Sequence, residues 1–284
     1  MINKICSFIE LARMDKPIGI YLLLWPSLLG YVLAGINSDI EFKNFIIVVI
    51  GSILVRSCGC VINDISDYKI DKLVQRTLNR PLASGSISLI EAWLFFLILS
   101  ILSLVLLFQT NPLTVKISLF FAFLIILYPL TKRFFVAPQF ILGITFGSGS
   151  IIAYSLESSV FSSSLAILYS GIIAWIISFD TYYALEDKKD DEKIGVNSTA
   201  ILWGDNSIIY SKMLHIFFYI CLLTIGLVNS FSYIFYIFFC ILIYLFIIQA
   251  KIINEKKYIE AFKINNWIGI TALISFAIEI IFLS

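Results

Sequence analysis

Histidine and paired cysteines are nearly absent from this chain. His215 is the single histidine, which argues against zinc or haem sites built from several histidines. None of the five cysteines belongs to a CxxC pair. Cys58 and Cys60 flank Gly59 in an apolar run, a pattern typical of small packing residues rather than of a disulfide or metal site.

Charge is also scarce. Only 14% of the 284 residues are charged, and the formal net charge is +1, which argues against a nucleic-acid-binding surface. The first sixteen residues lack a leading apolar core, so we expect no cleavable signal peptide. Their charged residues are Lys4, Glu10, Arg13, Asp15 and Lys16.

Apolar residues are abundant, at 60% of the chain. A soluble domain of this size cannot bury so much apolar surface, whereas a membrane protein exposes it to lipid. A membrane-spanning helix needs about 20 apolar residues. We identify nine candidate spans, at residues 17–36, 44–62, 91–108, 113–130, 136–154, 165–184, 209–228, 231–250 and 266–283. The sequence therefore predicts an all-α, multi-pass protein in which residues 1–284 form a single integral membrane domain.

Lysine and arginine are distributed unequally between the loops. Of the twenty, Lys43 and Lys116 fall on one side of the predicted membrane and Arg56 lies within a span, while the rest fall on the other side. Basic loops face the cytoplasm. We therefore expect the N-terminus and the long loops at 63–90 and 185–208 to be cytoplasmic, with the C-terminus on the far side.

A polar run, residues 63–71, directly follows the second candidate span. Asn63, Asp67 and Asp71 are four residues apart, so on a helix they point within about 40° of one another. Oxygen-bearing side chains next to hydrocarbon are costly unless a cation neutralises them. A hard divalent metal is the first candidate.

A second acidic stripe closes the sixth candidate span on the same predicted side. Asp180, Asp187 and Asp191 share one helical face, with Tyr183 beside it. An acid-rich loop can also be a solvated face, and that interpretation stays open for the neighbouring acids. These are Glu186, Asp190 and Glu192.

Two facing carboxylate clusters repel unless cations lie between them. Mg²⁺ prefers oxygen ligands and is commonly held by a few carboxylates together with substrate phosphates. The two stripes therefore indicate a metal-bridged phosphate or diphosphate. Arginine and lysine on the same side suit such a ligand, although the positive-inside rule alone also explains them. These residues are Arg76, Arg80, Lys132 and Arg133.

A cation-coupled transporter is an alternative, because transporters also place acids within spans. It predicts charges near the middle of the membrane and on both sides, whereas these acids gather at one side. A non-catalytic membrane protein is the weakest alternative, since so many acids need a ligand to neutralise them.

The motifs resemble the signatures of the UbiA superfamily of intramembrane aromatic prenyltransferases, and most closely its 4-hydroxybenzoate polyprenyltransferase branch. The resemblance runs from about residue 8 to residue 206. The two main motifs are Asn63-Asp64-x-x-Asp67-x-x-x-Asp71 and Asp180-x-x-Tyr183-Ala184-x-x-Asp187-x-x-x-Asp191. Supporting segments are Leu11 to Gly19, Trp25-Pro26, Arg56 to Ile62, Arg76 to Leu82, Tyr128-Pro129 with Lys132-Arg133, and Ser198-Thr199-Ala200.

The resemblance implies nine helices around a central cavity that opens laterally to lipid, in a membrane of the bacterial inner-membrane type, and catalysis dependent on Mg²⁺. It implies polyprenyl diphosphate and 4-hydroxybenzoate as substrates, while no obligate protein partner is evident. The residues it assigns to metal and diphosphate are Asn63, Asp67, Asp71, Asp187 and Asp191, with Asp64 and Asp180 nearby and Lys132 and Arg133 on the diphosphate.

The reaction implied is transfer of a polyprenyl group to the ring carbon ortho to the hydroxyl of 4-hydroxybenzoate, in ubiquinone biosynthesis. Tyr183 is the best-placed aromatic ring to stabilise an allylic cation. Arg56 lies two helical turns before Asn63 on the same stripe, and we expect it to hold the benzoate carboxylate or an aspartate. Other acceptors within the family remain alternatives, namely a naphthoate, a homogentisate-like acid or haem.

Overall fold

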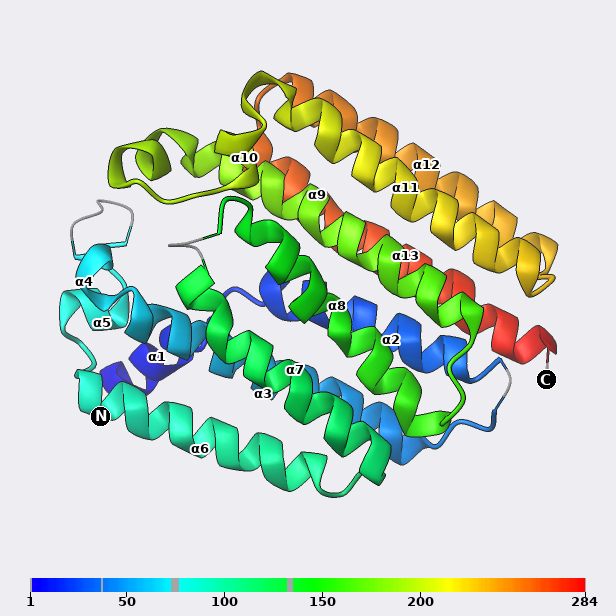
Figure 1. The fold of residues 1–284 in the computed structure, drawn as a ribbon, viewed down its shortest axis with the longest axis horizontal. Helices are drawn as coiled ribbons and strands as arrows, with labels where there is room; N and C mark the ends of the chain where they lie inside the picture. The colour runs from blue at the N-terminus through cyan, green and yellow to red at the C-terminus, as the bar shows by residue number, and fades with distance from the viewer. Residues whose placement is uncertain (1, 37, 73–76, 132–134, 284) are drawn as a thin grey trace.

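The computed structural model describes residues 2–36, 38–72, 77–131 and 135–283, and every regular element in these ranges is a helix (Figure 1). The α-helices are α1 (Ile2–Leu11), α2 (Ile18–Ala34), α3 (Phe42–Ser66), α4 (Tyr68–Asp71), α5 (Pro81–Ser84), α6 (Leu89–Leu107), α7 (Pro112–Thr131), α8 (Pro138–Glu157), α9 (Ser163–Ile194), α10 (Thr199–Leu202), α11 (Ser207–Val228), α12 (Tyr233–Asn254) and α13 (Tyr258–Leu283), with a 3₁₀ turn, η1, at Gly204–Asn206.

The nine candidate spans correspond to nine of these helices. Seven are long and apolar enough to cross a membrane, namely α3, α6, α8, α9, α11, α12 and α13. The shorter apolar helices α2 and α7 correspond to the other two predicted spans. The prediction of an all-α integral membrane protein is confirmed, while the central cavity stays a prediction.

Two helices extend well beyond the apolar spans predicted within them. α9 continues ten residues beyond the predicted end at residue 184, because no glycine or proline interrupts it before Gly195. Gly195 ends the helix in the left-handed conformation, with φ 71°. α13 begins at Tyr258, eight residues before the predicted start at residue 266. The extension of α9 carries the acidic stripe, whose spacing already predicted a helix, whereas the polar start of α13 gave no such signal.

α9 lies at the centre of the main hydrophobic core and packs against α8, α11 and α13. Trp175 of α9 is fully buried and stacks on Phe218 of α11, with ring centroids 4.8 Å apart. Its indole N–H donates to Oδ1 of Asn265 in α13 at 2.8 Å. The hydrogen bond satisfies a polar group inside an apolar interior, and so fixes α9 against two neighbours.

The two acidic segments lie at the same end of the bundle. Figure 1 shows the N-terminus, α4, α5 and the C-terminal part of α9 at one end, with the C-terminus of the chain at the opposite end. The two acidic segments, which the charge pattern predicted to lie on one side of the membrane, therefore lie at the same end of the helix bundle.

Close contact between α2 and α8 gives a first prediction. A methyl group at Gly30 would collide with the backbone carbonyl of Ser150, which cannot rotate away. We expect Gly30→Ala to lower the free energy of unfolding by about 1–3 kcal/mol, as overpacking does. Gly59→Ala is the matched control, because a Cβ there meets nothing within 4 Å. Thermal unfolding in detergent measures both, and equal stability of the two variants would contradict the close contact.

Candidate functional site

The first acidic segment runs through the end of α3 into α4. α3 ends at Ser66, and Asp67 is a C-cap residue with φ −92° and ψ 3°. The predicted uninterrupted helix is therefore wrong at this residue, because the backbone turns out of helical geometry there. The helical register survives, since the Asp67 N–H donates to the Asn63 carbonyl and the Asp71 N–H to the Asp67 carbonyl, both at 2.9 Å.

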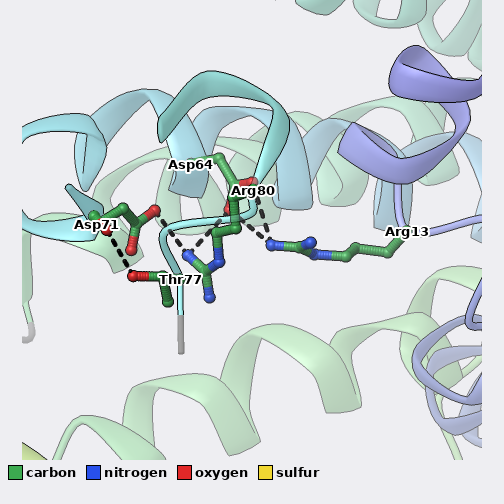
Figure 2. A network of polar contacts seen from close by, with 5 residues as sticks. All are labelled: Arg13, Asp64, Asp71, Thr77 and Arg80. Atoms are coloured by element: carbon green, nitrogen blue, oxygen red, sulfur yellow. Dashed lines mark hydrogen bonds and ion pairs between the residues drawn. The ribbon is translucent and has the colours of Figure 1, made fainter. Parts of the chain in front are cut away.

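Four charged side chains form a network beside this segment (Figure 2). Arg13 donates from Nη2 to both carboxylate oxygens of Asp64, at 3.0 and 3.1 Å. Arg80 lies between two acids, donating to Asp64 Oδ1 at 3.3 Å and to Asp71 Oδ2 at 2.8 Å. Thr77 donates to the backbone carbonyl of Asp71 at 2.8 Å, which secures the loop that carries Arg80.

Burial explains why this network is strongly paired. The Asp64 side chain is 2% exposed, while those of Arg13 and Arg80 are 26% and 20% exposed. A buried carboxylate is unstable without a charged partner. Burial alone lowers the pKa of the Arg80 guanidinium, but the carboxylates of Asp64 and Asp71 raise it by more, so that this pKa lies above its ordinary value.

The structure gives Asp64 direct partners, because its carboxylate binds Arg13 and Arg80. The position near the metal or substrate that the resemblance implied for Asp64 stays a prediction. No sequence motif indicated these partners. One signal was present in the sequence. Asp64 lies about 100° from Asn63 around α3, so its side chain points away from the acidic stripe and towards other partners.

The second acidic segment is a continuous part of α9. Asp180, Asp187 and Asp191 are each half-buried, whereas the off-stripe acids Glu186 and Glu192 are exposed. The aligned acids therefore face the protein while the other two are solvated, as the alternative interpretation allowed for them. The side chain of Asp190 lies outside the described residues.

Tyr183 and Arg56 occupy defined positions near aromatic rings. The Tyr183 ring meets Phe262 of α13 edge-on, with centroids 5.3 Å apart. The Arg56 guanidinium lies over the Phe146 ring at 5.5 Å and against Gly19 of α2, where a Cβ would collide with it. Arg56 Nε is buried and has no hydrogen-bond partner among the described residues. A buried donor in that state suits an incoming acceptor such as a carboxylate.

The remaining basic candidates, Arg76, Lys132 and Arg133, lie outside the described residues. The donor chemistry of the described candidates fits a hard metal, because the amide of Asn63 and the five stripe aspartates all offer oxygen atoms as ligands. Within the described ranges, no three His, Cys, Asp or Glu side chains form a group that could hold a metal ion. Mg²⁺ does not require such a cage, since substrate phosphates and water commonly complete its coordination.

Comparisons with known proteins identify the family of this chain. The UbiA prenyltransferase family matches residues 23–270. A curated relative from Saccharophagus degradans, named 4-hydroxybenzoate octaprenyltransferase, is 36% identical over 276 residues, which are 96% of this chain and 92% of that protein.

Two solved structures share the fold. The apo structure of a UbiA homologue from Aeropyrum pernix K1 has a TM-score of 0.80 at 22% identity, and the match covers 92% of this chain and 97% of that one. A UbiA homologue from Archaeoglobus fulgidus bound to GPP and Mg²⁺ has a TM-score of 0.72 at 17% identity, covering 95% and 99%. The resemblance drawn from the motifs is confirmed, and the chain belongs to the UbiA prenyltransferase family.

Proposed function

We propose that this protein transfers a polyprenyl group from polyprenyl diphosphate to the ring carbon ortho to the hydroxyl of 4-hydroxybenzoate, giving 3-polyprenyl-4-hydroxybenzoate for ubiquinone biosynthesis. The observation that carries the proposal is the convergence of two acidic segments at one end of the bundle, beside an arginine-rich network. The Saccharophagus relative supports the choice of acceptor.

Asn63, Asp67, Asp71, Asp187 and Asp191 are the proposed ligands of Mg²⁺. When bound, Mg²⁺ neutralises diphosphate charge and makes diphosphate a better leaving group. The Archaeoglobus homologue bound to GPP and Mg²⁺ supports this use of a divalent ion. The proposal assigns Asp180 and Asp64 to the surroundings of the substrate, with Asp64 acting through Arg13 and Arg80.

Basic side chains complete the diphosphate site in this proposal. Lys132, Arg133 and Arg76 bind the diphosphate oxygens, and Arg133 shares the negative charge that develops as the C–O bond breaks. Arg80 is ion-paired with Asp71, so it orients one proposed ligand.

The proposal assigns the aromatic acceptor to the neighbourhood of Arg56 and Tyr183. The Arg56 guanidinium pairs with the benzoate carboxylate, while the Tyr183 ring stabilises the allylic cation left after diphosphate departs. The ring carbon forms a C–C bond to that cation and then loses its proton, which restores aromaticity. Water must be excluded because it would trap the cation.

The membrane orientation follows the same proposal. The N-terminus and both acidic segments face the cytoplasm, supported by the excess of lysine and arginine in the loops of that side. A water-soluble diphosphate group then reaches the site from the cytoplasm while its prenyl tail stays in the bilayer.

Product mass is the decisive experiment. Membranes containing the protein are incubated with 4-hydroxybenzoate and a mixture of prenyl diphosphates, and we expect a prenylated 4-hydroxybenzoate. A parallel panel of naphthoate, homogentisate and haem tests the other family acceptors. Product from one of these alone would replace the proposed acceptor, and transport of labelled substrate with no prenylated product would favour the transporter.

Metal removal gives a second prediction. We expect excess EDTA to abolish product formation and added Mg²⁺ to restore it, because the diphosphate is a poor leaving group without a cation. Boiled membranes supply the background rate. Activity indifferent to chelation would contradict the oxygen-ligand assignment.

Arg56 gives a third prediction. Arg56→Ala should raise the KM for 4-hydroxybenzoate about tenfold or more, by removing a charge-assisted hydrogen bond, with little change in the KM for the prenyl donor. Arg56→Lys keeps the charge and should retain part of the affinity. The opposite pattern of KM values would refute the assignment.

A further inference from the structure

α9 continues beyond Thr181 to Ile194. The chain then turns back, so that Thr199 contacts Thr181. The hydroxyl oxygens of Thr181 and Thr199 lie 2.7 Å apart. The backbone N–H of Thr199 donates to Oε1 of Gln139 in α8 at 2.9 Å. These three residues, hereafter the threonine tie, join α8, α9 and α10 at one point.

The direction of the hydrogen bonds in the threonine tie can be assigned. Thr181 Oγ1 donates its single proton to the Ile177 carbonyl at 2.7 Å. The Thr199 hydroxyl must therefore be the donor to Thr181. Thr199 is the first residue of α10, where a backbone N–H has no acceptor within the helix, and Gln139 supplies one.

The threonine tie is buried. Thr181 and Thr199 are 0% exposed and Gln139 is 6% exposed, so water cannot replace a lost partner. The polar groups of the threonine tie therefore depend on one another for hydrogen bonds, and this dependence fixes the geometry of the contact.

The acidic part of α9 is fixed at both ends. The turn after the helix is closed at Asp191, whose carbonyl accepts the N–H groups of Gly195 and Val196. The return from this turn ends in the threonine tie. Asp187 and Asp191 thus lie in a closed segment between two hydrogen-bonded points, and cannot shift along α8 without breaking a buried contact.

We propose that Gln139 and Thr199 are positioning residues that hold Asp187 and Asp191 at the place where prenyl diphosphate binds. This inference rests on the proposed function. Neither residue touches the substrate; both act through the segment that carries the acids. Gln139 also follows closely in sequence on Lys132 and Arg133, so the threonine tie links the acidic segment to the helix that follows the proposed diphosphate-binding pair.

Binding of geranyl diphosphate with Mg²⁺, measured by titration of the full chain in detergent without an aromatic acceptor, tests the proposal. We expect Gln139→Met and Thr199→Val each to weaken binding about tenfold or more, since a displacement near 1 Å has large effects at such sites. Thr199→Ser keeps the hydroxyl and should bind within about twofold of the unaltered protein.

Gln249→Met is the matched control. Gln249 is a fully buried glutamine of α12 that donates to the Ala261 carbonyl, so its loss perturbs the bundle without touching the threonine tie. We expect this variant to lose thermal stability but to keep its affinity for geranyl diphosphate. Equal loss of affinity in Gln249→Met and Gln139→Met would reduce the threonine tie to a structural contact and overturn the proposal.

Other outcomes are also decisive. If Thr199→Val and Gln139→Met both fold and bind geranyl diphosphate with unchanged affinity, the proposal is overturned. If Gln139→Met does not fold, the affinity of Thr199→Val decides alone, because valine keeps the shape of the threonine side chain. Failure of the proposed function is recognised separately, because the unaltered protein then makes no prenylated 4-hydroxybenzoate. An unaltered protein that binds no geranyl diphosphate overturns both.

Discussion

Asp67→Ala and Asp187→Ala are each expected to lower the rate of prenyl transfer by on the order of 10³-fold, which is close to abolition in a membrane assay. Each change removes a carboxylate from a different acidic segment. Without it, the proposed metal site loses one of its four carboxylate ligands, and the charge on the departing diphosphate is poorly compensated. Turnover of radiolabelled prenyl diphosphate into product measures the effect.

Variants of the same size and a distant acid serve as controls. Asp67→Asn and Asp187→Asn keep the shape but remove the charge, and should lose nearly as much activity as the alanine variants. Asp205→Ala removes an exposed acid from η1 and should leave turnover unchanged. Near-normal turnover in Asp67→Ala or Asp187→Ala, with normal membrane insertion, would contradict the proposal that both acidic segments bind the metal and the diphosphate.

Asp64→Ala has the largest expected effect on stability. The Asp64 carboxylate is 2% exposed and is shared by Arg13 and Arg80, so its removal leaves two guanidinium groups short of a partner. We expect a loss of about 3 kcal/mol, at the low end for breaking a buried pair because both arginines keep partial exposure. The Tm in detergent should fall by roughly 6–12 °C.

An exposed ion pair provides the comparison. Lys257 and Glu255 are 2.8 Å apart, but both side chains are more than half exposed, and Glu255→Gln should not change the Tm measurably. A double-mutant cycle of Asp64→Ala with Arg13→Ala isolates their coupling. Additive effects of the two changes would show that the Arg13–Asp64 contact contributes nothing to stability.

The acidic segments show how far local sequence patterns reach. Spacing of four residues placed Asn63, Asp67 and Asp71 in one register, and backbone hydrogen bonds keep that register through the break at Asp67. The apolar span predicted at 165–184 covers only part of α9, because the last turns of the helix are polar, and the spacing of the acids is what predicted helix beyond residue 184. Helical register depends on neighbouring residues, whereas the end of a helix also depends on caps such as Gly195.

The sequence by itself determined the membrane class, the nine apolar segments and the two acidic motifs, because hydrophobic length and helical spacing are properties of adjacent residues. Only the tertiary structure decided the partners of Asp64 and the threonine tie. Arg13 is 51 residues from Asp64, and Gln139 is 60 residues from Thr199. Contacts over such separations depend on how the helices pack, and no local period in the sequence encodes them.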